Sequence, residues 1–584
     1  MDIQIFDNNL KSDGHSSKSF FWSSSIYDKK SFDNIVENKK VYLKSKFLNC
    51  ISHITKNSIK NNKTLKFMGV NLFEMSLVNE KNVYKSKRIY DCLKLLALED
   101  LIEKKKISKI TYLGDNKRLS LSLKQLTKNK NIIFKNNIYF TRIETPFVHL
   151  FRALFFYLNF IIRNYRKKSI NKFNKDITFF SYFVHFSNLK TKEYNSFLWG
   201  GLNKMLKIKK IDSNWLHFFV PSSQIKTIDE ANFNIKNYNQ SKYENHLILN
   251  SYLNIKEIIY LIFEYFFIFC KTLILSNLKK NFFIRKITDC NFYEILKKDV
   301  YSSSYGASLL YNMYNIKLLN KLLRDMPKQR LGFYLLENQS WENCLIKFWR
   351  KYNHGQLVGC INSTIRFWDL RYFKTKKEFF DENNPDHYFF NSRTFKKIAL
   401  KNFYPKKKCH VVEAVRYNHL MSLKTKKNKK ILIIGDINLT ENIRILEEFG
   451  KIRKKLSKYK VYFKPHPTNS NKKINQLEKK YNKIIFLNNS KQNSFKDYEF
   501  IICSNGTSAI IDCIIIKAKY KIIKFNDLLN LNPLDNYPHN QLTNMSEIYD
   551  FINSKKKQKN YKNFLLLDKS LKKWKKFILF HDKN

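Results

Sequence analysis

Two short polar stretches in the C-terminal third of the chain have residue types and spacing that could do chemistry. Lys464-Pro465-His466-Pro467 follows an apolar run at residues 461–463, and a Ser/Thr/Gly-rich turn at residues 504–508 follows a second run at 500–503. Both runs are β-branched and aromatic, which predicts buried parallel strands. Ligands of open α/β sheets bind just beyond such strand ends. The two prolines end the first strand and hold His466 at the rim of the sheet.

The second stretch precedes an apolar run at 509–516 that predicts the start of a helix. Hydroxyl groups and free backbone N–H groups would meet at the positive end of this helix, where a phosphate could bind. The side chains expected to take part are Ser504, Asn505, Thr507 and Ser508. A plainer interpretation is also open, in which His466 is a turn histidine bonded to a carbonyl and the Ser/Thr run is an ordinary helix cap.

These motifs resemble those of a known enzyme class. Residues 464–467 and 504–512 are similar to the His-Pro and Ser/Thr-rich motifs of bacterial GT-B glycosyltransferases that use CMP-activated acidic sugars, the sialyl- and Kdo-transferases. A longer resemblance, to surface-carbohydrate (O-antigen or capsule) biosynthesis proteins, runs through residues 71–81, 331–342 and 368–372. It would cover most of the chain from about residue 65 to 530.

The resemblance implies a fold and an activity. The fold would be α/β and GT-B-like, with two Rossmann-type doubly wound domains facing a cleft. A nucleotide-sugar donor, CMP-linked, would bind the C-terminal domain through Lys464, His466 and the 504–508 turn, with Asp512 accepting from a ribose hydroxyl. The reaction would be an inverting transfer to a glycan or lipid-linked acceptor, with no metal ion and no cofactor. Two positions depart from the pattern: Asn362 stands where a histidine is expected, and Asp512 where these enzymes usually have Glu.

Such a transfer needs a carboxylate to take the proton of the acceptor hydroxyl. Glu337, at the end of a predicted strand at 331–336, is the preferred candidate, and Glu342 and Asp369 are the others. Gln339 and Trp341 could line the acceptor pocket, although a core position is the more common fate of an indole. Glu342 could instead stabilise the first turn of a helix, and Asp369 could pair with Arg366 or Arg371.

Composition limits the classes of partner. The formal net charge is +60, from 108 basic and 48 acidic residues, which suggests nucleic acid, anionic lipid or acidic sugar donors. The basic residues are spread over the whole chain, so the charge also fits an A+T-rich coding sequence. The nine cysteines show no C-x-x-C and no zinc-like spacing, which favours reduced thiols in a cytoplasmic protein.

Length and pattern predict three segments. Residues 1–60 are polar and are expected to be partly disordered, with little function. Residues 61–425 are expected to form an N-terminal, acceptor-side α/β domain, and residues 426–584 a C-terminal Rossmann-like donor domain that ends in a helix. The basic run at 424–430 is the predicted linker.

Two apolar segments interrupt the first domain, near residues 147–168 and 255–280. Each contains charged residues and basic flanks, so neither predicts a clean transmembrane span. They fit either buried core helices or basic, aromatic helices that lie on an anionic membrane surface. The second interpretation places the protein at the inner face of the membrane, where it would meet a lipid-linked acceptor.

Two other functions remain open. A CDP-glycerol glycerophosphotransferase of the teichoic-acid type would share the fold and the cytidine donor. A basic nucleic-acid-binding protein would gather Arg, Lys and stacking aromatics on one face, whereas the aromatics here lie within apolar runs. No nucleic acid is therefore expected as a partner.

Overall fold

The computed structural model of the chain describes most of the 584 residues. The described residues are 1–7, 18–22, 31–61, 65–137, 144–165, 173, 175–186, 189, 193–222, 224–275, 278–381, 383–423, 428–466, 469, 471–487, 495–525, 529–535, 542–543, 547–554 and 564–580. Most of the predicted linker, Pro467 and the basic flank at 166–168 lie outside these ranges.

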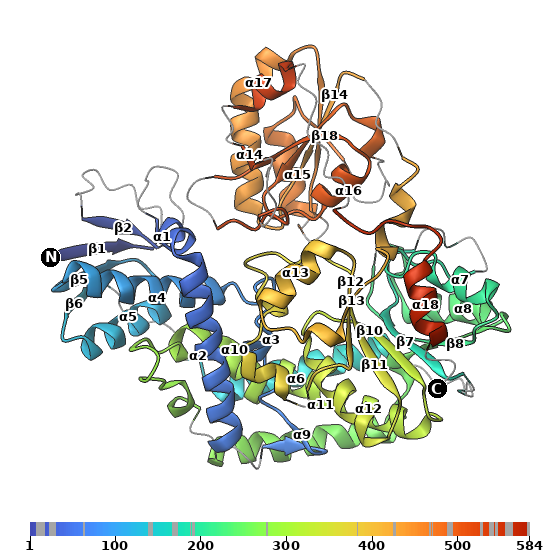
Figure 1. Cartoon of the computed structure of the whole chain (residues 1–584). Helices are drawn as coiled ribbons and strands as arrows, with labels where there is room; N and C mark the ends of the chain where they lie inside the picture. The colour runs from blue at the N-terminus through green and yellow to red at the C-terminus, as the bar shows by residue number, and fades with distance from the viewer. Residues whose placement is uncertain are drawn as a thin grey trace.

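The C-terminal domain, orange and red in Figure 1, is built on a six-stranded sheet with the order β16-β15-β14-β17-β18-β19. Every neighbouring pair is parallel, and helices connect the strands. The elements are β14 (Lys430–Ile434), α14 (Leu439–Ile452), β15 (Lys460–Lys464), α15 (Asn471–Lys480), β16 (Ile485–Phe486), β17 (Phe500–Ser504), α16 (Ala509–Ile515), β18 (Lys519–Ile523), β19 (Leu542–Thr543) and α17 (Ile548–Asn553). The central strands read as continuous apolar runs because both faces of the sheet are covered.

A seven-stranded parallel sheet forms the second doubly wound domain, with the order β13-β12-β11-β10-β7-β8-β9. Its elements are β7 (Ile177–Tyr182), α7 (Leu202–Ile208), β8 (Ser213–Phe218), α8 (Ile228–Tyr238), β9 (Glu244–Ile248), β10 (Leu331–Leu335), α12 (Ser340–Lys351), β11 (Gln356–Ile361), β12 (His387–Phe390), α13 (Arg393–Lys401) and β13 (Cys409–Val411). The predicted α/β class with two Rossmann-type domains is confirmed.

A smaller parallel sheet, order β2-β1-β5-β6, is built from residues 2–136. Its elements are β1 (Asp2–Phe6), β2 (Ser19–Phe21), α1 (Phe32–Asn38), α2 (Lys40–Asn61), α4 (Arg88–Lys105), β5 (Lys109–Leu113), α5 (Lys117–Asn129) and β6 (Ile133–Asn136). The described part of residues 1–60 therefore differs from the loosely ordered segment expected there. On β1 the buried residues Ile3 and Ile5 alternate with exposed ones. On α1 and α2, Phe32, Leu43 and Phe47 bury one face. A polar segment can therefore fold here with few apolar residues.

Helices form a layer along the bottom of the view in Figure 1. They are α6 (Pro146–Asn164), α9 (Ile255–Leu275), α10 (Tyr293–Tyr305) and α11 (Ala307–Asp325). The short α3 (Leu77–Glu80) packs on α10, and β3 (Lys66–Phe67) forms an antiparallel hairpin with β4 (Val70–Asn71). The two apolar segments of the sequence become α6 and α9. Both pack on α10 and α11, and each keeps large apolar side chains exposed.

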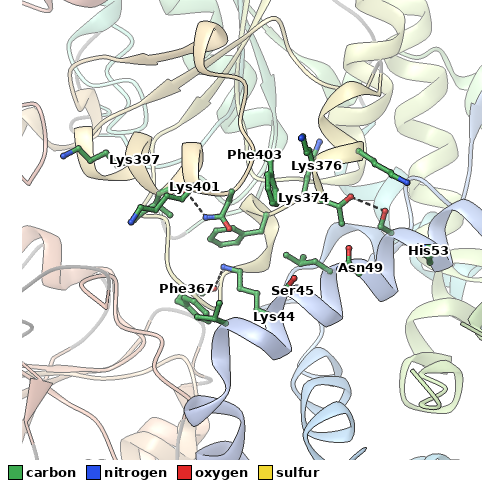
Figure 2. A pocket seen from close by; sticks show the side chains of 18 of the residues that line it. Lys44, Ser45, Asn49, His53, Phe367, Lys374, Lys376, Lys397, Lys401 and Phe403 are labelled. Carbon is green, nitrogen blue, oxygen red and sulfur yellow. Dashed lines mark hydrogen bonds between the residues drawn. The ribbon is translucent and has the colours of Figure 1, made fainter. Parts of the chain in front are cut away.

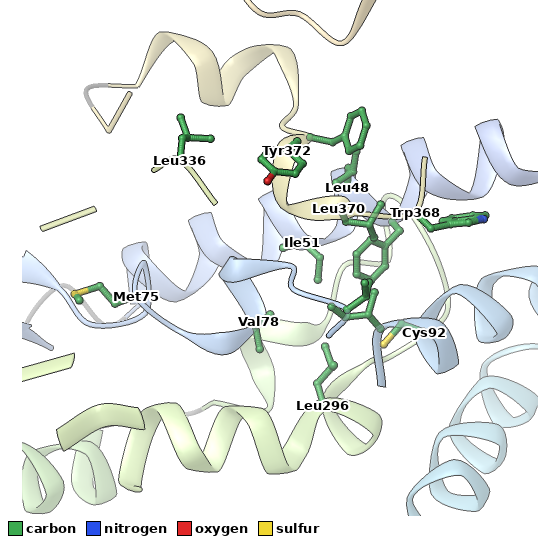
Figure 3. Close-up of a cluster of buried hydrophobic side chains, with 14 of the residues drawn as sticks. Leu48, Ile51, Met75, Val78, Cys92, Leu296, Leu336, Trp368, Leu370 and Tyr372 are labelled. Carbon is green, nitrogen blue, oxygen red and sulfur yellow. The ribbon is translucent and has the colours of Figure 1, made fainter. Parts of the chain in front are cut away.

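The four-stranded sheet and its helices, residues 2–136, are called the first unit below. One hydrophobic core joins this first unit to the seven-stranded domain. Figure 3 shows Leu48 and Ile51 of α2 beside Leu370 and Tyr372, which belong to the turn η3 (Leu370–Tyr372). The last helix, α18 (Lys572–Phe580), leaves the C-terminal domain and packs on the seven-stranded sheet, where Trp574 donates to the Glu413 carbonyl at 2.9 Å. The C-terminal domain thus ends structurally before α18.

Candidate functional site

Three neighbouring strands bring polar residues to one edge of the C-terminal sheet. Asp436 follows β14, His466 follows β15, and Gly506 follows β17. The Asp436 carboxylate accepts from the backbone N–H groups of Gly506 (3.1 Å) and Asn438 (3.0 Å). A Cβ on Gly506 would stand 2.6 Å from Asp436 Oδ2, so this close approach requires glycine. Asp436 therefore fixes the turn after β17.

A cavity of about 350 Å³ opens at this edge, between the C-terminal domain and the first unit. Ser504 and Asn505 lie on its wall. Ser504 Oγ and Asn505 Oδ1 are buried, and neither has a hydrogen-bond partner among the residues that the structure describes. Buried polar atoms are usually bonded, so these two atoms are groups to which a molecule in the cavity could supply a partner.

The opposite wall of the cavity comes from the first unit. Tyr84, Lys87 and Tyr90 lie there, and Phe525 contributes an aromatic ring from the C-terminal side. Four carboxylates line the same cavity: Asp33, Asp91, Asp436 and Glu441. Two lysines, Lys87 and Lys94, also line it, so carboxylates outnumber cations by two. This lining fits a planar ring and hydroxyl groups better than a phosphate.

Cations gather beyond this cavity. Burial lowers the pKa of Lys464, and the nearby Asp512 opposes this change. Burial raises the pKa of Asp512 to about 7, while Arg416 and Lys464 act in the opposite direction. Arg416 belongs to the turn η6 (Val415–Leu420) of the seven-stranded domain. The charged group of Lys464, Asp512 and Arg416 therefore spans the cleft between this domain and the C-terminal domain. Burial also lowers the pKa of His466, against the influence of Asp436.

The structure separates the predicted donor-binding residues into two groups. Ser504 and Asn505 line the cavity, whereas Lys464, His466 and Asp512 do not. Thr507 accepts from the Ala509 N–H at 3.3 Å, which is a local turn bond, and Ser508 is the exposed N-cap of α16. Since α16 has only seven residues, its dipole gives weak support for a phosphate at its N-terminus.

The predicted base, Glu337, lies just beyond β10 in an ion-pair chain. Arg371 binds Asp369 through two nitrogens, at 2.8 and 2.7 Å, and its third contact is with Glu337 Oε2 at 3.5 Å. Asp369 is 2% exposed and fully engaged, while the Glu337 side chain is 31% exposed. The Arg371 guanidinium also lies 5.4 Å from the Tyr84 ring, on the cavity wall. Of the two carboxylates paired with Arg371, Glu337 is thus the more exposed, although it does not line the cavity.

Three other residues that the sequence suggested for the site, Glu342, Gln339 and Trp341, cap or pack α12. Glu342 accepts from the backbone N–H groups of residues 337, 338 and 339, at 2.9 to 3.2 Å, and so caps α12. Burial raises its pKa to about 8, and the amide donors oppose this change. Gln339 is the N-cap of α12 and donates to Glu337 at 3.1 Å. Trp341 is buried and donates to the Tyr182 hydroxyl at 2.9 Å, as expected of a core indole.

Arg366 holds the two sides of the cleft together. It donates to the carbonyls of Gly506 (2.6 Å) and Leu531 (3.2 Å), both in the C-terminal domain. Asn362, which stands where a histidine was expected, donates to the Leu198 carbonyl at 3.0 Å. The loop after β11 therefore serves to position the domains.

Sequence reasoning missed Asp436 and Tyr84. The signal for Asp436 was present, because Gly435-Asp436 directly follows an apolar strand as the two chosen motifs do. Tyr84 gave no such signal, since it lies in an irregular segment before α4 and far from the C-terminal domain in the chain. Among the described residues, no group of three His, Cys, Asp or Glu side chains could hold a metal ion.

Comparisons with known proteins give distant structural similarity. No protein-family model and no curated protein matches the chain. Among solved structures, a UDP-N-acetylglucosamine 2-epimerase aligns with 71% of this chain and 97% of its own, at 10% identity and a TM-score of 0.40. A glycosyltransferase from Rickettsia africae aligns with 70% of this chain and all of its own, at 12% identity and 0.38. Anabaena HepE, solved with UDP and glucose, aligns with 65% of this chain and 89% of its own, at 8% identity and 0.36.

Proposed function

We propose that the protein is a glycosyltransferase of bacterial surface polysaccharide (O-antigen or capsule) biosynthesis that uses a nucleotide-sugar donor. The observation that carries the proposal is the pair of buried, unbonded atoms, Ser504 Oγ and Asn505 Oδ1, on a cavity between the C-terminal domain and the first unit. A donor that bonds to them would satisfy both atoms.

The charge pattern suggests how a donor lies. Hydroxyl groups of a ribose or sugar can donate to Asp436 and Glu441 in the acidic cavity, and a base can stack on Tyr84 or Phe525. The donor phosphate belongs beyond the cavity, beside Lys464 and Arg416 and within reach of the His466 imidazole, which can donate a hydrogen bond. These groups would stabilise the negative charge that the leaving phosphate gains in the transition state.

Glu337 is the proposed base. The acceptor oxygen attacks the anomeric carbon and loses its proton to Glu337, while the bond from that carbon to the donor phosphate breaks and its electrons stay on the phosphate. Attack from the face opposite the leaving group inverts the anomeric centre. Arg371, paired with Glu337 and lying over Tyr84, would hold the base beside the bound donor.

The proposed donor is a CMP-linked acidic sugar, supported by the resemblance of residues 464–467 and 504–512 to CMP-sugar motifs. Thermal unfolding of the whole chain with CMP, CDP, UDP and GDP tests it, because a ligand of the native state raises the melting temperature. The whole chain is needed since α18 packs on the other domain. A larger shift with UDP or GDP than with CMP would contradict the proposal of a cytidine donor, but not the proposal of a glycosyltransferase.

Removal of one unbonded atom tests the site itself. Ser504→Ala should leave the melting temperature of the free protein unchanged and reduce the nucleotide-induced shift, because the hydroxyl has no partner until a ligand arrives. Ser122→Ala on α5 is the matched control, since Ser122 Oγ is also buried without a partner in the described structure. If the nucleotide raised the melting temperature of both variants equally, the cavity would not be the donor site.

We also propose that the protein lies on the cytoplasmic face of the membrane, where it meets a lipid-linked acceptor. Helices α6 and α9 are in contact, since Tyr157 donates to the Ile258 carbonyl at 3.3 Å. Their outer faces expose Phe151 (70%), Phe155 (72%), Phe263 (66%) and Phe267 (67%). By length and composition, α6 is the one described helix that could cross a membrane, and 22% of its apolar window is buried. A paired apolar face of this kind fits a surface contact with lipid.

Vesicle co-sedimentation tests the membrane proposal. Phe155→Ser with Phe263→Ser should lower the fraction bound to anionic vesicles at low salt. The matched control is Ile208→Ser with Phe233→Ser, which changes two residues of α7 and α8 that are each 66% exposed. Equal loss in both double variants, or no binding by the native protein, would contradict the proposal.

A further inference from the structure

A cavity of about 930 Å³ lies away from the cleft. Figure 2 shows it between α2 below, with Lys44, Ser45, Asn49 and His53, and the segment 367–377 and α13 above. The transferase site proposed above uses none of its lining residues. The cavity is named here the α2–α13 cavity.

The charges on this lining are all of one sign. Seven of the 20 lining residues are lysines, and among these residues none is Asp or Glu. The lysines are Lys44, Lys56, Lys374, Lys376, Lys377, Lys397 and Lys401. Basic residues are 108 of 584 in the whole chain, so the lining is about twice as basic as the average. Grouping like charges around a cavity costs free energy that a bound anion would offset.

Two of these lysines are held inside the protein. Lys44 donates to the Phe367 carbonyl at 2.9 Å and lies over the Phe367 ring at 4.4 Å, and burial lowers its pKa. Lys374 donates to Asn384 at 2.9 Å, and burial lowers its pKa to about 8. A smaller cavity of about 80 Å³ shares Lys374 and is lined by Glu74, Glu378 and Asp381, while the charges of Asp369 and Asp535 act on Lys44. The lysines of the α2–α13 cavity are thus positioned by the fold.

The remaining lining is apolar. Leu48, Phe367, Phe373, Ile398 and Phe403 contribute aliphatic and aromatic surface to the same cavity. Phe403 is 54% exposed although it is large and apolar. Phosphate groups can bind the lysines as point charges, while a hydrocarbon or ring attached to them covers the apolar surface.

We propose that the α2–α13 cavity is a second ligand site, which binds the phosphate groups of an anionic ligand that also carries an apolar portion. The segment 366–377 separates it from the cleft: Arg366 and Arg371 contact the cleft side, while Phe367 and Phe373 line the cavity. A ligand here therefore binds without competing for the donor cavity. The proposal does not depend on the transferase activity.

Calorimetric titration of the full chain with geranyl diphosphate and with inorganic pyrophosphate tests the site. Both should bind, and geranyl diphosphate should bind more tightly. Lys397→Gln with Lys401→Gln, two exposed lysines one turn apart on α13, should weaken both by at least about tenfold. Lys124→Gln with Lys128→Gln is the matched control, with the same spacing and charge change on α5.

Equal weakening in the control pair would mean that net charge alone drives binding, and absence of binding by the native protein would overturn the site outright. Vesicles of anionic phospholipid separate the two sources of phosphate. Binding to vesicles without binding to geranyl diphosphate would replace the site with a membrane contact. Competition between geranyl diphosphate and a nucleotide would place both in one cavity and contradict the second site.

Discussion

The cleft cavity and the α2–α13 cavity are opposite in character. The cleft cavity holds four carboxylates and two unbonded polar atoms, whereas the α2–α13 cavity holds seven lysines and an apolar floor. On our proposals, the first would select a ligand by directed hydrogen bonds, which need precise placement. The second would attract one by charge, which acts over longer distances and is screened by salt.

The difference shows how little a net charge of +60 says about any one site. The cavity with the best evidence for a directed ligand is acidic, although the chain is strongly basic. The lysines that gather at the α2–α13 cavity come from α2, the 367–377 segment and α13, which are far apart in the chain. Charge therefore becomes informative only after the fold has brought it together.

Glu337→Gln gives the largest expected effect and belongs to the cleft alone. Turnover should fall by roughly 10²–10⁴-fold, because glutamine keeps the shape of the side chain but takes no proton. Nucleotide affinity and geranyl diphosphate affinity should not change. Single-turnover transfer assays and calorimetry measure the three quantities.

Asp369→Asn is the comparison for that experiment. Asp369 is bonded to Arg371 through both oxygens, so its loss should release Arg371 and lower stability as well as activity. A fully active Glu337→Gln variant would remove Glu337 as the base, whatever the result for Asp369.

His466→Ala should sharpen the contrast between the cavities. Loss of one hydrogen bond to a charged phosphate costs about 1.5–3 kcal/mol, or about 10- to 150-fold in nucleotide affinity. Binding of pyrophosphate to the α2–α13 cavity should stay the same. Titrations of both ligands against one variant measure this directly, and a silent substitution would mean that the phosphate lies elsewhere.

The fold was predictable where strands are buried on both faces. The apolar runs that became β14, β15 and β17 stand out because no polar residue interrupts them. The first unit was not predictable in the same way, since β1 and β2 are short and α2 mixes Lys, Asn and Ser with its buried Leu43 and Phe47. Its strands depend on pairing with β5, about a hundred residues away.

The site was predictable in part for a related reason. Ser504 and Asn505 follow a recognisable strand, and Glu337 does too, so strand ends located them. Glu342 and Gln339 were harder to interpret, because a helix-capping pair and a catalytic carboxylate look alike in a sequence. Tyr84 and the lysines of the α2–α13 cavity required the tertiary packing of separate units.

Asp512→Asn tests the charged group beyond the cleft cavity. The folded protein holds the pKa of Asp512 at about 7, above its unfolded value, so the folded state binds more protons between about pH 4 and pH 7. Stability of the native protein should therefore fall as pH rises through this window. The variant lacks this loss, so it should be more stable than the native protein at pH 8, on the order of 4 kcal/mol, and equal to it near pH 4. Urea unfolding at several pH values measures the difference.

If the Asp512→Asn variant were less stable than the native protein at pH 8, the ionised carboxylate would stabilise the fold. The pairing of the carboxylate with Arg416 and Lys464 would then outweigh the cost of its burial. The donor-side cations would in that case need Asp512 for their own placement.

Raising the pH should weaken ligand binding at the α2–α13 cavity by a smaller amount. Burial and the neighbouring Lys81 lower the pKa of Lys374 to about 8, while Glu378, Glu342 and Asp381 oppose this change. Lys374 loses its charge as the pH passes 8, so one of seven cations disappears from the lining, and affinity for pyrophosphate should fall about two- to threefold between pH 7 and pH 9. A Lys374→Gln variant should bind more weakly at pH 7 and lose this dependence on pH. If the variant kept the full dependence, the titrating group would lie elsewhere in the cavity, and Lys44, whose pKa burial also lowers, would be the next candidate.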